Sequence, residues 1–269
     1  MRIGIVQMNS GSSVDKNLNR MSEWVAEAAS GGADLIAFPE MAYLTGGVAI
    51  WQPWIDRYDE IVTRVSELAK RHRIALHLGS LREPGTLSGR YFNTSVLISS
   101  EGKVLAKYRK VFLFRAYVAD RAYEESKYAD AGSEIVVHEP FGFAICFDLR
   151  FPELFRSLSH QGAKIIFLPS AFTVPTGRAH WETLLRARAI ENQCFIVAPD
   201  LVGKLGDGNT AYGHSMVISP WGEIVAEFNG EEEGVRVVDL DFDAINRANE
   251  IVSALSCRRD DLFPPVGSQ

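Results

Sequence analysis

The stretch Phe141-Gly-Phe-Ala-Ile-Cys-Phe-Asp-Leu-Arg-Phe-Pro-Glu-Leu154 decides how the middle of this chain folds. Its first five residues form an apolar run of strand length, and a polar turn begins at Cys146. Pro152 suits the first turn of a helix, where the N–H that proline lacks would have no partner. A strand, a sharp turn and a helix start in succession can lift a nucleophile out of a core towards a substrate. We therefore take Cys146 as a candidate nucleophile, although a cysteine within the strand itself would only be a small hydrophobic residue.

Two charged residues upstream of Cys146 also follow strand-like runs. Glu40 closes the run Leu35-Ile-Ala-Phe-Pro-Glu40, and ligands gather at the carboxyl ends of strands in α/β folds. Lys110 ends Lys107-Tyr-Arg-Lys110, just before an apolar stretch that could hold its ammonium group in a pocket. Taken singly, each also has an ordinary interpretation, Glu40 as a solvated loop residue and Lys110 as part of a solvated basic face.

Together the three side-chain types fit the hydrolysis of a carbonyl compound. A thiolate is a strong nucleophile, and a carboxylate such as Glu40 can accept the thiol proton and later activate water. The ammonium group of Lys110 and the backbone N–H of Phe147 can stabilise the negative oxygen of a tetrahedral intermediate, where one donor is worth ~10²–10³ in rate. A neighbouring positive charge favours thiolate, so we expect Lys110 to tune the pKa of Cys146.

Composition limits the class of protein. The 269 residues are 46% apolar and 23% charged, without a low-complexity linker, which predicts one globular domain over residues 1–269. No apolar stretch is long enough to span a membrane, and Met1–Gln7 is typical of a buried strand, not of a signal peptide. The three cysteines lie far apart, which favours a reducing, cytoplasmic setting over a disulfide framework.

Charge and motif content exclude further classes. The net charge is −6 without a basic tract, so nucleic-acid binding has no support. The sequence has neither His-Glu-x-x-His nor Cys-x-x-Cys, and we expect no metal. Asn93-Thr-Ser95 matches a glycosylation acceptor, but without a secretion signal we interpret the match as chance.

Apolar runs of strand length alternate with segments of helical period. Helices are expected over 16–29, 61–72 and 178–191, and a hairpin over 212–228. The runs expected to form strands are Arg2–Gln7, Leu35–Phe38, Ile74–Gly79, Ser95–Ile98, Phe141–Cys146, Lys164–Leu168 and Cys194–Ala198. The alternation predicts sheets covered by helices. Periodicity alone does not choose between a doubly wound sheet, a barrel and a two-sheet sandwich with helices outside.

Phe-Pro-Glu40, Tyr-Arg-Lys110 and Cys146-Phe-Asp-Leu-Arg-Phe-Pro-Glu153 resemble the three signatures of the nitrilase superfamily of carbon–nitrogen hydrolases, in the family's order and spacing. The resemblance extends from Ile3 to Phe263. It implies a four-layer α-β-β-α sandwich that uses no cofactor or metal. It also implies a homodimer or larger homo-oligomer that pairs through helix layers, and we expect the tail at about 249–269 to pack on a neighbouring element or partner subunit.

The resemblance assigns catalytic roles to Glu40, Lys110 and Cys146. A further family glutamate maps onto Glu125 in Tyr123-Glu-Glu-Ser126, with the adjacent Glu124 as the alternative. Phe147 is the residue whose N–H would complete the site for the negative oxygen.

Three further segments narrow the resemblance to one branch of amidases. They are Pro169-Ser-Ala-Phe-Thr173, Thr176-Gly-Arg-Ala-His-Trp-Glu182 and Leu185-Arg-Ala-Arg-Ala-Ile-Glu-Asn-Gln-Cys194. One group of this branch acts on deaminated glutathione, and a sister group, the omega-amidases, acts on 2-oxoglutaramate and 2-oxosuccinamate. The sequences of these segments are more similar to the group that acts on deaminated glutathione. We therefore expect a small carboxylate-bearing primary amide to be hydrolysed to acid and ammonia, with an omega-amidase or another nitrilase-superfamily amidase or nitrilase as the alternative.

The chain departs from this branch at two places that bear on the substrate. Arg115 stands where the branch usually has an acidic residue, and Val197-Ala-Pro-Asp200 replaces an Ala-Ala-Gln type of stretch. Arg150, Arg115, Phe172 and Thr173 are the residues we expect to contact a substrate carboxylate, with a structural salt bridge as the alternative role of Arg150.

Two other interpretations compete with the amidase. A Cys-His thiol hydrolase would use His214 or His180 as its base, although a structural role is the commoner one for a histidine in either position. A catalytically silent scaffold of the same fold would keep the architecture without turnover. In that case all three cysteines, including Cys194 in an apolar run and Cys257 in the charged tail, would react with alkylating reagents equally slowly.

Overall fold

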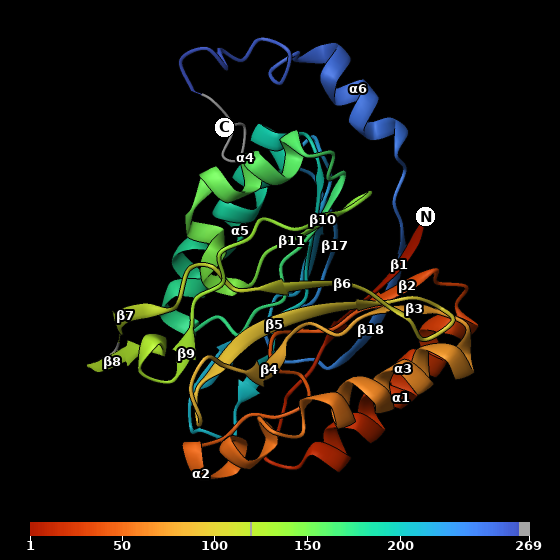
Figure 1. Cartoon of the computed structure of the whole chain (residues 1–269). Helices are drawn as coiled ribbons and strands as arrows, with labels where there is room; N and C mark the ends of the chain where they lie inside the picture. The colour runs from red at the N-terminus through yellow and green to blue at the C-terminus, as the bar shows by residue number, and fades with distance from the viewer. Residues whose placement is uncertain (119, 264–269) are drawn as a thin grey trace.

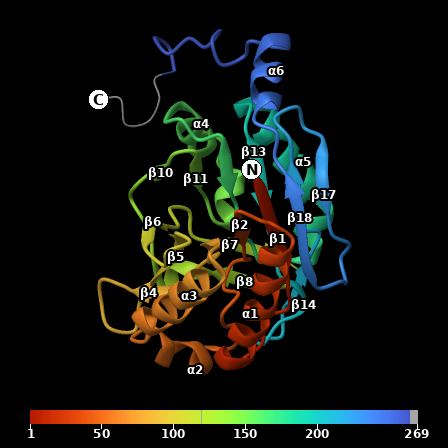
Figure 2. The same cartoon turned by 90° about the vertical axis from the view of Figure 1, so that its right-hand side faces the viewer.

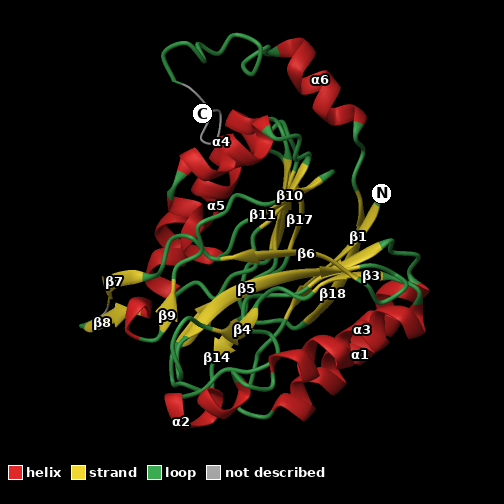
Figure 3. Cartoon of the chain, viewed as in Figure 1, coloured by secondary structure: helices red, strands yellow, loops and turns green. Residues whose placement is uncertain are grey.

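The chain forms two β-sheets that face each other, with helices on the outside of both (Figures 1 and 3). This computed structural model describes residues 1–118 and 120–263. In the first sheet the strand order is β18 (Gly234–Asp239), β1 (Arg2–Gln7), β2 (Leu35–Ala37), β3 (Ala75–His77), β5 (Tyr91–Ile98) and β4 (Leu81–Pro84), and β6 (Val104–Arg109) and β9 (Ala129–Asp130) also pair with β5. In the second sheet it is β10 (Val137–His138), β11 (Phe141–Phe143), β12 (Ile165–Phe167), β13 (Phe195–Ala198), β16 (Met216–Ile218) and β17 (Ile224–Glu227).

Helices cover the outer face of each sheet. The views in Figures 1 and 2 place α1 (Val14–Ser30) and α3 (Tyr58–His72) against the first sheet, and α4 (Pro152–His160) and α5 (Val174–Asn192) against the second. The short helices are α2 (Val48–Trp51) and α6 (Asp243–Ile251), and single 3₁₀ turns span Gln52–Trp54, Glu125–Lys127 and Cys146–Arg150. The expected four-layer α-β-β-α sandwich is confirmed.

Side-chain alternation along the strands builds the layers. On β2, Leu35 and Ala37 belong to the core that the two sheets share, whereas Ile36 packs with the residues of α1 and α3. A Cβ at Gly4 of β1 would lie 3.2 Å from Ala28 of α1 and 3.3 Å from Ile36, so Gly4 lets this helix approach the sheet closely. A strand with one face on a helix and the other on a second sheet is apolar throughout, which is why the sequence shows runs here instead of alternation.

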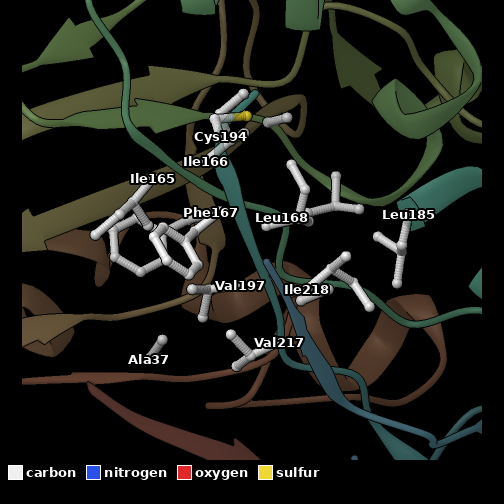
Figure 4. Close-up of a cluster of buried hydrophobic side chains, with 14 of the residues drawn as sticks. Ala37, Ile165, Ile166, Phe167, Leu168, Leu185, Cys194, Val197, Val217 and Ile218 are labelled. Atoms are coloured by element: carbon white, nitrogen blue, oxygen red, sulfur yellow. The ribbon is translucent and has the colours of Figure 1, made fainter. Parts of the chain in front are cut away.

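Figure 4 shows the same division in the second sheet. Phe167 and Val197, which are paired in register on parallel strands, point towards Ala37 of the first sheet. Leu168 and Ile218 point the other way, towards Leu185 of α5. Parallel neighbours among β11, β12 and β13 need helical crossovers, and α4 and α5 provide them.

The expected helices at 16–29, 61–72 and 178–191 are confirmed as α1, α3 and α5, and Pro152 opens α4 as predicted. The hairpin is shorter than expected, since positive φ angles at Gly213 and His214 interrupt the chain before β16. Tyr212 belongs instead to the ribbon of β14 (Val202–Lys204) and β15 (Thr210–Tyr212). A second ribbon joins β7 (Arg115–Val118) to β8 (Arg121–Glu124).

The C-terminal segment projects beyond α4 in Figures 1 and 2, but α6 is tied to the end of α5, where Gln193 Nε2 donates to the carbonyls of Ala248 (3.2 Å) and Val252 (2.6 Å). Residues 249–254 and most of those up to 263 are exposed. That this tail packs on a partner subunit remains a prediction, and its last residues, 264–269, lie outside the described residues. None of the helices within the described ranges has both the length and the apolar character needed to cross a membrane.

His77 lies in the layer between the sheets and has no exposed surface. Its ring stacks on Phe167 at 4.4 Å between centroids and lies 5.9 Å from Phe143, and Nε2 bonds Ser95 Oγ at 2.7 Å. Nδ1 has no partner among the described residues. Burial lowers the pKa of His77 to about 3, so the folded protein keeps a neutral ring at pH values where an unfolded chain has taken up a proton.

We predict that His77→Gln reduces the acid sensitivity of the fold. The unfolded histidine binds its proton near pH 6.5 and the folded one near pH 3, so stability falls as the pH drops below 6.5. Between pH 7 and pH 4 this linkage costs the wild type about 3 kcal/mol of unfolding free energy, which the variant should not lose. Urea unfolding at both pH values measures this loss of unfolding free energy. His160 is exposed, so His160→Gln is the control, and it should lose as much stability as the wild type. Equal losses in wild type and His77→Gln would contradict the prediction.

Candidate active site

Cys146 occupies the first position of a turn with an unusual backbone conformation. After β11 the chain enters the 3₁₀ turn Cys146–Arg150, and the φ angle of Cys146 is +47°. Its N–H donates to the carbonyl of Pro169 (3.0 Å), at the end of the neighbouring strand β12. A positive φ at a residue other than glycine costs of order 1–3 kcal/mol and persists only where the surroundings hold it. The expected strand, turn and helix start are thus confirmed, and the thiol emerges at the carboxyl end of the sheet.

Asp148 holds this turn against the segment that carries Lys110. Its carboxylate accepts hydrogen bonds from the Ile145 N–H (2.8 Å), the Phe112 N–H (3.0 Å) and the Tyr108 hydroxyl (2.7 Å). Burial raises the pKa of Asp148 to about 6, against the lowering effect of the bond from Tyr108. The sequence analysis did not assign this structural role to Asp148. An aspartate two residues after a candidate nucleophile, next to a buried strand, would have indicated it.

Lys110 lies between two carboxylates. Its Nζ donates to Glu40 Oε1 at 3.1 Å and to Glu125 Oε2 at 3.0 Å, and only 2% of the residue is exposed. Burial by itself lowers the pKa of Lys110, but the charges of Glu125 and Glu40 raise it well above its usual value. The lysine is therefore held as a fixed ammonium group, available to a negative oxygen in the same cavity.

The structure brings Glu125, and not Glu124, to this lysine. Glu125 Oε2 also accepts the backbone N–H of Phe114 at 2.8 Å. Burial acts to raise the pKa of Glu125, but Lys110 and the hydrogen bonds to the carboxylate lower it below its usual value. Glu124 is exposed and pairs with Lys127 at 3.3 Å.

Asn93 joins the two carboxylates. Its Nδ2 donates to Glu40 Oε1 (2.8 Å) and to Glu125 Oε1 (3.1 Å), and only 1% of Asn93 is exposed. A buried side chain with these bonds is no glycosylation acceptor. The sequence drew attention to Asn93 through that short motif, whereas its position opposite two carboxylates depends on strand pairing that the motif does not reveal.

Burial and the charge of Glu40 outweigh the effect that we expected of Lys110, which lowers the pKa of Cys146. Burial raises the pKa of the thiol, Glu40 raises it further, and Lys110 lowers it by less, so the pKa lies well above its usual value. Within the described part of the chain, no hydrogen bond links Sγ to the side chain of Glu40 or Lys110. The resting group is thus a neutral thiol, and its attack on a substrate requires a proton acceptor.

A cavity of about 500 Å³ opens at these groups. Eight of the nine predicted site residues line it, namely Glu40, Lys110, Glu125, Cys146, Phe147, Arg150, Phe172 and Thr173. The ribbons β7–β8 and β14–β15 meet beside it, where the Tyr123 hydroxyl donates to Asn209 Oδ1 at 3.0 Å and Arg121 Nη1 donates to the same oxygen at 2.5 Å.

Arg115 does not lie where we expected it to contact a substrate carboxylate. Arg115 is exposed on β7 and is not among the residues that line the cavity, whereas its neighbour Phe114 is. Successive side chains of a strand point to opposite sides, so a cavity that takes Phe114 leaves Arg115 facing solvent.

Arg150 has the position expected of a group that meets a substrate carboxylate. Its guanidinium lies 5.8 Å from the ring centroid of Phe147 and 5.7 Å from that of Phe172, and Nη1 donates to His180 Nδ1 at 3.4 Å. The described residues include no carboxylate partner for it, which leaves the alternative of a structural salt bridge without support.

Both histidines of the competing thiol-hydrolase interpretation are bonded to other side chains, His180 to Arg150 as described above. His214 Nδ1 bonds Glu227 Oε1 at 3.2 Å, and its ring stacks on Tyr212. Neither His214 nor His180 is among the residues lining the cavity.

Asp200, one of the departures noted in the sequence, supports the cavity lining at Phe172. It is fully buried, and its Oδ1 accepts the backbone N–H of Phe172 at 2.9 Å. Burial raises the pKa of Asp200 well above its usual value, against the lowering effect of the hydrogen bond from the Phe172 N–H.

Comparison with known proteins places these observations in a family. A family model described as carbon–nitrogen hydrolase matches residues 2–250. A deaminated glutathione amidase of Dictyostelium discoideum is 33% identical over 96% of this chain and 94% of its own length. An omega-amidase of Xenopus tropicalis is 34% identical over 97% of this chain and 96% of its own.

A solved structure with the same architecture also bears on the cysteine. A mutant of the amidase from Nesterenkonia sp. AN1 superposes with a TM-score of 0.81 at 26% identity, covering 98% of both chains. That structure shows the product of Michael addition of acrylamide to the active-site cysteine.

Proposed function

Because this chain belongs to the carbon–nitrogen hydrolase family, we propose that it is a thiol-dependent amidase in which Cys146 attacks the amide of a small carboxylate-bearing substrate. The observation that carries the proposal is the pairing of Glu40 and Glu125 with Lys110 in a cavity that Cys146 also lines. Members of the family hydrolyse carbon–nitrogen bonds. The carboxylates and the ammonium group of these residues can provide the acid, the base and the cation that such a reaction needs.

The reaction proceeds through an acyl-thioester. Cys146 Sγ bonds to the carbonyl carbon while its proton passes to Glu40, and the negative oxygen is met by Lys110 Nζ and the N–H of Phe147. The carbon–nitrogen bond then breaks, and Glu40 returns the proton to the leaving nitrogen. A water molecule deprotonated by Glu40 attacks the thioester, and the acid leaves with the thiol restored. Glu125 takes no proton in this scheme but fixes Lys110.

The carboxylate-bearing substrate is inferred from Arg150, because a half-buried guanidinium without an acidic partner in the described chain favours an anionic ligand. Phe172 and Thr173 line the cavity beside it and would contact the same end of the substrate. We place deaminated glutathione first among candidate substrates and the omega-amidase substrate 2-oxoglutaramate second, following the relatives' names.

The assembly and cellular location follow the family pattern in our proposal. Two or more copies would pair through their helix layers, and the enzyme would work in the cytoplasm, where its three free cysteines stay reduced. Size-exclusion chromatography with light scattering measures the first of these.

A substrate screen tests the function. Purified protein is incubated with deaminated glutathione, 2-oxoglutaramate, simple aliphatic amides and nitriles, and both ammonia and the product acid are measured. We expect hydrolysis of carboxylate-bearing amides to exceed that of neutral amides, with nitriles inert. Absence of turnover with every compound, from a folded protein with a reduced Cys146, would favour the silent scaffold.

A further inference from the structure

A second buried guanidinium lines the same cavity, and the reaction just described does not use it. Arg82 lies on β4, and only 8% of it is exposed. Its Nη1 donates to the Tyr43 hydroxyl (3.3 Å) and to the Leu44 carbonyl (3.2 Å). Nε is buried without a partner, and no carboxylate among the described residues pairs with the side chain.

Two aromatic rings lie against this guanidinium. Its central carbon lies 4.8 Å from the centroid of Trp51 and 5.3 Å from that of Tyr91, and both rings also line the cavity. Nη1 is bonded to oxygen and Nε is sealed without a partner. Burial acts to lower the pKa of Arg82, but a hydrogen bond with the Tyr91 hydroxyl helps to raise it. Nη2 is therefore the guanidinium nitrogen that is not sealed and has no carboxylate partner among the described residues. An accessible guanidinium N–H without an acidic partner can donate a charge-assisted hydrogen bond to a carboxylate oxygen.

Arg82 also lies next to the reacting groups. It is the antiparallel partner of Asn93, the residue that bonds both Glu40 and Glu125. Directly opposed residues of an antiparallel pair have Cβ atoms about 5 Å apart, so Arg82 and Asn93 share one face of the sheet. Lys110 is matched by two carboxylates, whereas none of the three arginines that line the cavity has one in the described chain. Arg121 is bonded to Asn209 Oδ1, and Arg82 is the most buried of the three.

We propose that Arg82, framed by Trp51 and Tyr91, forms a second anion subsite that binds a carboxylate distinct from the one at Arg150. This inference deepens the proposed function and rests on it: the substrates are amides that carry two carboxylates. A substrate with a single carboxylate leaves one guanidinium unpaired and binds more weakly.

Binding to Cys146→Ala protein tests the subsite without requiring turnover. The probes are N-glutarylglycine, which has a carboxylate on each side of its amide, and the analogue whose glycine carboxylate is an N-methylamide. Calorimetry should show the diacid binding about 10- to 100-fold more tightly, the range expected for a charge-assisted hydrogen-bonded pair. Adding Arg82→Gln should remove this preference by weakening the diacid alone, and Arg82→Lys should restore part of it.

Arg109→Gln is the matched control. Arg109 is an exposed arginine on the nearby strand β6, paired with Glu83 and outside this cavity, so its loss changes the net charge equally and should keep the preference. Equal affinity for both probes, or binding of neither, would overturn the subsite, and this comparison stands even if Arg82→Gln does not fold. An equal loss for both probes in Arg82→Gln would assign Arg82 to balancing the charge of Glu40 and Glu125 instead. Failure of the substrate screen with an intact probe preference would overturn the hydrolysis and keep the subsite.

Discussion

Cys146→Ala is expected to abolish amide hydrolysis, lowering kcat by of the order of 10⁶-fold, as removal of the nucleophile does in enzymes that form covalent intermediates. Without sulfur no thioester forms, and the remaining groups can only position water near the carbonyl. The fold should survive, because alanine keeps the Cβ and removes an atom that has no side-chain hydrogen bond to Glu40 or Lys110. Initial rates of product acid and far-UV circular dichroism measure the two effects.

The other two cysteines provide the controls. Cys257 is exposed, so Cys257→Ala should leave kcat unchanged and also removes a competing thiol from labelling experiments. In that background an alkylating amide analogue should modify Cys146 and spare Cys194, which is fully buried and whose pKa burial raises to about 12. Hydrolysis that persists in Cys146→Ala, or slow and equal labelling of Cys146 and Cys194, would contradict the assignment.

Glu40→Gln is expected to lower kcat by about 10²–10⁴-fold, the range for loss of a general base. The amide is nearly isosteric with the carboxylate and can still accept the hydrogen bond from Asn93, but it takes no proton from the thiol. The same substitution should make the thiol more reactive towards alkylating reagents. The charge of Glu40 raises the pKa of Cys146, so its removal lowers that pKa and increases the thiolate fraction at neutral pH. Alkylation of Cys146 should therefore shift to lower pH while hydrolysis is lost.

His214→Ala is the matched variant for the competing base. His214 is bonded to Glu227 away from the cavity lining, so most of the activity should remain. Loss of turnover in His214→Ala together with its retention in Glu40→Gln would reverse the roles and favour a Cys-His hydrolase. Parallel pH profiles of kcat and of alkylation separate this outcome from misfolding.

Local sequence signals were sufficient where a residue's role depends on its own segment. The apolar run before Cys146 and Pro152 after it predict the strand, the turn and the helix start, because each depends on neighbours a few residues away. Glu40 likewise follows β2 in sequence and needs no distant contact to emerge at the sheet edge.

Residues that act across elements left no comparable signal. Asn93 meets Glu40 and Glu125 because β5 lies beside β3 in the sheet, a pairing that the strand run itself does not specify. Asp148 connects two segments 36 to 40 residues apart. The error at Arg115 has a third cause, since a shift of one residue along a strand moves a side chain to the opposite face.

The two ribbons that meet at Asn209 surround the entrance of the cavity, whereas the groups that carry out the reaction lie deeper inside it. The sulfur, the ammonium and the Glu40 carboxylate follow strands of the two large sheets, whereas the rim is made of the two-stranded ribbons β7–β8 and β14–β15, and Glu125 directly follows β8. Insertions or exchanges in those short hairpins can therefore change which molecules are admitted, provided that Phe114 and Glu125, which flank β7–β8, keep their contacts with each other and with Lys110. Sequence differences between enzymes of this kind should therefore be most frequent in these two ribbons. Replacing the ribbons of this chain with those of a relative is a direct way to transfer the relative's substrate preference.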